Sequence, residues 1–162
     1  MHDWERPAPG ELARVQELVN TLDLETGEDV LSADWLAEHG LAPAADLGAV
    51  RELREGLRGV LLAHNGVEID PPALRASVTV AFDADGTPRL SAEEAVGQVL
   101  AIVAVAAAEG TWERLKACPA EACHMAFYDF SRNHSRTWCT MSVCGNRAKA
   151  RSYRARQPKA SA

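Results

Sequence analysis

All four cysteines of the 162-residue chain lie in one short stretch, in two pairs of equal spacing. Each pair has the form C-x4-C, made by Cys118 with Cys123 and by Cys139 with Cys144. A short loop between two cysteines can direct both sulfurs toward one ion, and four thiolates can surround Zn²⁺ tetrahedrally at about 2.3 Å. Because a closed four-sulfur shell has no position for water or substrate, the spacing predicts a structural zinc site and not a catalytic one.

Other uses of the cysteines are open at this point. Two disulfides or four free thiols are the simplest, but we expect a cytoplasmic protein, since the N-terminus lacks a basic start followed by an apolar stretch. His124 or His134 could replace one cysteine, although four cysteines already complete the shell. A thiol redox switch would require exposed, easily oxidised cysteines. Zinc is the interpretation that the paired spacing favours.

Charge is strongly segregated along the chain, although the net formal charge is only -6. Residues 1–110 contain 7 Lys and Arg against 20 Asp and Glu, whereas residues 111–162 contain 10 basic residues against 3 acidic ones. All the cysteines fall in the basic part. We therefore predict two domains that meet near Gly110, an acidic helical regulatory domain (1–110) and a basic zinc module (111–162).

The last segment of the basic part is predicted to be a helix. It has good helix formers and no Pro or Gly before Pro158, and it contains no carboxylate side chain. Its small residues Ala148, Ser152 and Ala155 share one face, which we expect to pack on the zinc module. The remaining faces present five cations, Arg147, Lys149, Arg151, Arg154 and Arg156.

These cations repel one another unless an anion neutralises them, so the pattern predicts a partner. The candidates are nucleic-acid phosphates, the acidic part of the same chain and, least favoured, an anionic membrane. Arg132 and Arg136 lie in or beside a polar turn and are the candidates for contacts with base edges, since arginine can pair bidentately with guanine.

Alternation of apolar residues predicts two strands in the zinc module, at residues 125–130 and 136–138, joined by the polar turn 131–135. With the cysteine pairs on either side and the basic helix after them, the order is zinc loop, hairpin, zinc loop, helix. The sequence therefore predicts a treble-clef-like module.

The acidic part is predicted to be helical. Apolar residues recur at helical spacing in residues 10–24 and 46–64, and Ser32 is placed to cap a short helix between them. Residues 78–82 and 87–90 flank an Asp-Gly turn signal and are predicted to form a small hairpin.

A second capping signal follows the hairpin. Ser91 with Glu94 forms a capping box that would open a long apolar helix ending at Gly110, and we expect this helix to be the centre of the core. Its longest purely apolar run has ten residues, too few to cross a membrane as a helix. Asn20, Thr21 and Asp23 could line a small-molecule pocket, but such residues more often cap a helix. Residues 1–110 contain no catalytic constellation, so we predict that the protein is not an enzyme.

The C-terminal residues resemble the CGNR zinc finger family of bacteria. The motif stands as Cys144-Gly145-Asn146-Arg147 after Trp138-Cys139, and the match covers about residues 113–157. The upstream segment, with LVNTL at 18–22 and WLAEHGL at 35–41, is similar to the helical domain of stress-induced transcription regulators that usually precedes this finger. The resemblance implies zinc at Cys118, Cys123, Cys139 and Cys144 and a nucleic-acid-binding role for the basic residues.

Together these features predict a mainly α fold with a small treble-clef-like zinc module. The predicted function is a zinc-binding transcription regulator that binds nucleic acid, DNA in preference to RNA, with a small molecule or protein as effector of the N-terminal domain. The alternative is an interaction or scaffold protein whose basic helix binds an acidic protein surface.

Overall fold

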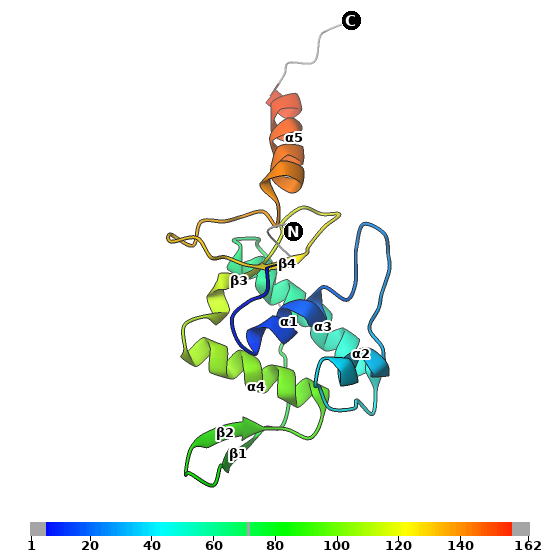
Figure 1. The fold of residues 1–162 in the computed structure, drawn as a ribbon. Coiled ribbons are helices and arrows are strands. Elements are labelled where there is room, and N and C mark those ends of the chain that lie inside the picture. Colours follow the sequence, from blue (N-terminus) through cyan, green and yellow to red (C-terminus); the bar gives the residue numbers. More distant parts are fainter. Residues whose placement is uncertain (1–5, 71, 157–162) are drawn as a thin grey trace, which may run out of the picture.

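The computed structural model describes residues 6–70 and 72–156, and in this part of the chain it has five α-helices and two antiparallel hairpins (Figure 1). The α-helices are α1 (Leu12–Val19), α2 (Ala33–Glu38), α3 (Leu47–His64), α4 (Ala95–Ala108) and α5 (Asn146–Arg156). The strands are β1 (Thr79–Phe82), β2 (Pro88–Ser91), β3 (Leu115–Ala117) and β4 (Ala126–Tyr128). A 3-10 turn, η1 (Trp112–Arg114), precedes β3, and a π-helical turn, η2 (Met141–Gly145), precedes α5. The predicted mainly α fold with a small cysteine-rich module is confirmed.

The main core lies where α1, α3, α4 and the β3–β4 hairpin meet. The helical spacing of apolar residues places Val15 and Leu18 of α1 in this core, together with Leu57 and Leu61 of α3, and each is almost fully buried. α3 is the longest of the described helices and contacts both α1 and α4. The two periodic stripes in the sequence therefore form the centre of the N-terminal part.

The predicted helix starts are correct at α2 but not at α4. Ser32 Oγ accepts a backbone N–H from the first turn of α2 at 3.1 Å, and Asp46 similarly caps α3 at 2.7 Å. The capping box at Ser91 is wrong, because Ser91 ends β2 and pairs with Thr79 of β1. α4 instead begins after Glu94, whose side chain makes no cap hydrogen bond.

α4 is not the centre of the core, contrary to the prediction from its composition. Val99 is fully buried, but Val105 is 44% exposed, and α4 buries only the side that faces α1 and α3. A helix that is apolar all round need not be surrounded, because its burial depends on how many neighbours the chain supplies. No helix of the described residues has the length and apolar character needed to span a membrane.

The first hairpin is confirmed and the second is paired differently from the prediction. β1 and β2 are antiparallel, and Gly86 in their turn has φ 82°, in the left-handed region. β4 pairs with β3, which precedes the first cysteine pair, and residues 136–138 form no strand. Leu115 and Ala117 of β3 are fully buried against the helices, so β3, and not residues 136–138, lies beside β4.

The β3–β4 hairpin is bound to the helices by buried polar contacts as well as by the core. The Asn20 side chain donates to Ala126 O at 3.0 Å and accepts from Ala126 N at 2.7 Å, so it pairs with β4 as another strand would. Arg58, only 3% exposed, donates to Val19 O at 2.8 Å and to His124 O at 3.1 Å. Asn20 therefore has a structural role that its position beside an apolar stripe did not reveal.

Candidate metal centre and basic helix

The structure brings the four cysteine sulfurs together in one cluster. Their Sγ atoms all lie within 4.8 Å of one another, with 3.5 Å from Cys123 to Cys139 and 3.6 Å from Cys139 to Cys144. Adjacent sulfurs of a tetrahedral ZnS₄ centre lie about 3.8 Å apart, whereas a disulfide requires about 2.05 Å. The spacing therefore fits a metal ion held by four thiolates.

Two local structures position the sulfurs. Cys118 and Cys123 lie in the turn between β3 and β4, where Cys118 N donates to Met125 O at 3.0 Å and closes the turn. Cys139 precedes the π-helical turn η2, and Cys144 lies within it, two residues before α5 begins at Asn146. Because one pair comes from a hairpin and the other from a helix start, folding of the loop between them determines whether the site forms.

Burial separates the four thiols from solvent only in part. Cys118, Cys139 and Cys144 are buried and Cys123 is half-buried. In the described residues, the metal-type cluster contains these cysteines and neither His124 nor His134. Three of the four thiols are therefore shielded from solvent, which disfavours a simple redox switch, and the cluster offers four sulfurs as donors.

The pKa values of the four thiols are shifted in different directions by their contacts with one another and by burial. A hydrogen bond with the Cys123 thiol lowers the pKa of Cys118 to about 2, and the same contact raises the pKa of Cys123 to about 12. Hydrogen bonding to Cys118 also raises the pKa of Cys139, and burial is the main cause of the raised pKa of Cys144. The four thiols thus differ in how readily they ionise, and a divalent cation such as Zn²⁺ among the sulfurs would favour the thiolate form of all of them.

A buried ion pair organises the loop between the two cysteine pairs. Asp129 is fully buried, and its Oδ2 accepts from Lys116 Nζ at 2.8 Å and from Arg136 N at 3.0 Å. Its Oδ1 accepts from Ser131 N at 2.9 Å. Burial by itself raises the pKa of Asp129, but the hydrogen bonds from Lys116 and Ser131 outweigh it and bring the pKa to about 2. Neither member of this pair was predicted from the sequence. The one local signal is an aspartate two residues before a serine.

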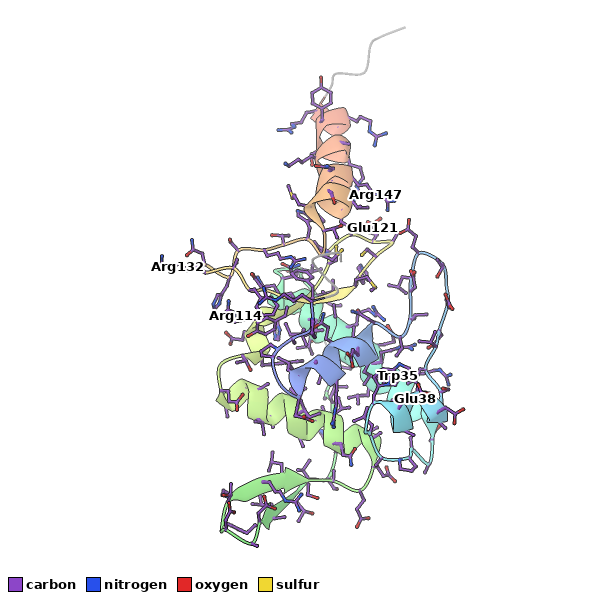
Figure 2. The ribbon with its side chains drawn as sticks, viewed as in Figure 1. Trp35, Glu38, Arg114, Glu121, Arg132 and Arg147 are labelled. Carbon is purple, nitrogen blue, oxygen red and sulfur yellow. The ribbon has the colours of Figure 1, made fainter. Side chains whose placement is uncertain are left out.

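Arg136 is used inside the module. Its guanidinium donates to Trp138 O at 3.0 Å and to Cys139 O, and it lies 4.7 Å from the centroid of the Phe127 ring. This geometry ties the second cysteine pair to β4. Arg132, in contrast, lies in the loop at the side of the molecule and points away from the body (Figure 2). Of the two arginines predicted to contact bases, Arg132 is the one whose side chain extends into solvent.

The basic helix α5 extends away from the rest of the molecule (Figure 1). None of its residues is buried. The expected packing of Ala148, Ser152 and Ala155 on the zinc module is wrong, because Ser152 and Ala155 are exposed and Ala148 is half-exposed. A face of small residues packs only where another segment lies against it, and α5 projects beyond the zinc module.

One ion pair connects α5 with the acidic part of the chain. Arg147 Nη1 lies 3.2 Å from Glu25 Oε1, and both side chains are more than half exposed. Arg147 is at the base of the helix (Figure 2). The other described basic residues of α5 make no ion pair with an acidic residue; Arg154 and Arg156 donate to carbonyls of their own helix. The acidic part thus leaves most of α5 uncovered.

Two family models match the chain, and they meet within η1. Residues 12–112 match ABATE, described as a putative stress-induced transcription regulator, and residues 114–157 match the CGNR zinc finger. No curated protein matches the chain. The predicted resemblance is confirmed, in the predicted order along the sequence. The chain belongs to the ABATE family of putative stress-induced transcription regulators, with a CGNR zinc finger on the C-terminal side of that domain.

Proposed function

We propose that the protein is a transcription regulator that binds duplex DNA through α5 and Arg132, and that one structural zinc ion forms the base of this surface. The observation that carries the proposal is the exposure of α5: its five basic side chains project from the body without an acidic residue on the helix. An α-helix fits the major groove of B-DNA, and phosphates would relieve the repulsion among the cations. The zinc finger and the regulator domain of the family support the same direction.

In this proposal the zinc ligands are Cys118, Cys123, Cys139 and Cys144, and the ion supplies charge neutralisation and cross-linking. The residues of the chain do the positioning. The thiolates fix the start of α5 against the β3–β4 turn, and the Asp129–Lys116 pair sets the loop that carries Arg132. Arg136 contributes indirectly, since its guanidinium holds the second cysteine pair.

The DNA contacts divide into two classes. Arg147, Lys149, Arg151, Arg154 and Arg156 would contact phosphates, which position the protein without reading sequence. Arg132, at the tip of a separate loop, would contact a base edge. Arg132→Gln should therefore weaken binding to a preferred site more than to unrelated duplex.

The salt dependence of binding tests this proposal on the full-length, zinc-loaded protein, because the β3–β4 hairpin shares its core with the helices. Five phosphate contacts predict a slope of log affinity on log salt of about -4.5 for duplex DNA. The double variant Arg151→Gln with Arg154→Gln loses two contacts, so its slope should be less negative by about 2. As a matched control, Arg14→Gln with Arg89→Gln removes the same charge from the N-terminal part and should leave the slope unchanged.

Two results would count against the proposal. An absence of duplex binding at about 50 mM salt would remove the nucleic-acid role and favour the alternative of an acidic protein surface as partner. Equal slopes for the α5 variant and its control would show that α5 is not the binding surface.

A further inference from the structure

The β1–β2 hairpin projects from the body at the end opposite α5 (Figure 1). One of its faces is apolar, because Val80 pairs with Leu90 and Phe82 pairs with Pro88 across the strands. Val80 is 61% exposed and Phe82 is 69% exposed. The hairpin therefore presents large apolar side chains to solvent, on a two-stranded sheet that is only marginally stable by itself.

The hydrogen-bond pattern shows which backbone groups of β1 face outward. Asp83 N donates to Thr87 O at 3.0 Å, and Pro88 has no N–H, so Phe82 and Pro88 form a non-hydrogen-bonded pair. Since the two kinds of pair alternate, Ala81 bonds toward β2, while Val80 and Phe82 direct their N–H and C=O groups to the outer edge. No described strand pairs with this edge.

The two outer edges of the hairpin differ in their protection. On β2, Pro88 removes an outward donor and Arg89 adds a charge, which are common ways of blocking an edge strand. On β1, residues 78–82 read VTVAF, with neither proline nor charge. An open, apolar edge of this kind is a template for another strand. The open edge is therefore β1, and the closed edge is β2.

We propose that β1 pairs antiparallel with β1 of a second copy of this chain, about a two-fold axis at Val80. Identical antiparallel strands are self-complementary in this arrangement. Val80 lies opposite Val80 of the second copy, and Val78 lies opposite its Phe82, with all these side chains on one face. The outward groups of both strands are then paired, and apolar side chains meet across the axis.

Charge complementarity supports a second copy as the partner. In this arrangement the segment before β1, which carries Arg75, runs toward the turn after β1 of the other copy, which carries Asp85. Both are exposed, and neither makes an ion pair with a described residue of its own chain. Parallel pairing in register would oppose like charges, so antiparallel pairing of identical chains is the arrangement that the charges favour.

The dimer should be weak and concentration-dependent, since one strand pair buries less than the roughly 800 Å² per partner of a standard interface. It leaves both α5 helices free, because the hairpin and α5 lie at opposite ends of the molecule (Figure 1). The proposal is thus independent of nucleic-acid binding, and it is tested without nucleic acid.

Sedimentation equilibrium of the full-length, zinc-loaded protein from about 5 to 500 µM should show a monomer–dimer equilibrium. Val80→Pro removes an outward N–H and no bond to β2, and it should weaken the dimer by about tenfold or more. Leu90→Pro is the matched control, because Leu90 lies directly opposite on β2 and directs its N–H to the edge that is already blocked. It should leave the dimer constant within about twofold.

A charge exchange provides a second test that does not alter the strands. Arg75→Glu should weaken the dimer, and adding Asp85→Arg should restore it, since the pair would then be reversed. A protein that stays monomeric at the highest concentration overturns the proposal. Equal effects of Val80→Pro and Leu90→Pro, or no restoration by the charge exchange, would also overturn it.

Discussion

Replacing Asp129 by asparagine should destabilise the zinc-loaded protein strongly at neutral pH. The carboxylate is fully buried and accepts three hydrogen bonds, from Lys116 Nζ at 2.8 Å, Arg136 N at 3.0 Å and Ser131 N at 2.9 Å. An asparagine amide retains one accepting oxygen and turns a donor toward groups that are themselves donors. Lys116, only 8% exposed at its side chain, then keeps a buried charge without a counterion.

The expected loss is about 3–5 kcal/mol in the free energy of unfolding, the range for breaking a buried ion pair by removing one member. Urea denaturation followed by circular dichroism measures it, with zinc present in excess. Asp83→Asn is the matched control, because the Asp83–Arg89 pair has side chains 49% and 58% exposed and should lose less than about 1 kcal/mol.

A double variant separates the cause from a general disturbance of the loop. If the unpaired ammonium produces the loss, Lys116→Met combined with Asp129→Asn should be more stable than Asp129→Asn alone. A loss below about 1 kcal/mol for Asp129→Asn, comparable with that of the exposed control, would refute the role given to the pair.

Three further outcomes are expected. In acid, the depressed pKa of about 2 means that Asp129 stabilises the fold above pH ~4 and that about 2 kcal/mol is lost as pH falls toward 2; a flat difference between wild type and Asp129→Asn across this window would contradict it. Cys139→Ser should release zinc, measured by elemental analysis, and both this change and chelation should lower the melting temperature of the N-terminal helices by several degrees, because the β3–β4 hairpin shares their core; an unchanged value would indicate independent folding. Backbone amides of α5 should exchange rapidly in the free protein and become protected on DNA, since the helix has no buried residue; full protection without DNA would contradict this.

The chemistry of the protein is largely local in sequence. Two C-x4-C pairs restrict each pair of sulfurs to one loop, so residue type and spacing were enough to predict the sulfur cluster. The charge of α5 is equally local, because no acidic side chain follows Asp129. The apolar stripes of α1 and α3 and the cap at Ser32 were also predicted, since each depends on residues within one or two turns.

Only the tertiary structure decided which distant segments meet. Alternation favoured residues 136–138 as the partner of β4. It cannot show that β3 takes this place against α3, or that Asn20 pairs with Ala126 of β4 from more than a hundred residues away. The contacts of Arg136 and Asp129 likewise form only when the loop between the two cysteine pairs folds back on itself. The helix α5 has no buried residue because no other described segment packs beside it. Spacing along the chain determines which groups share a loop or a helix face, whereas contacts between segments depend on the whole core, which no local pattern contains.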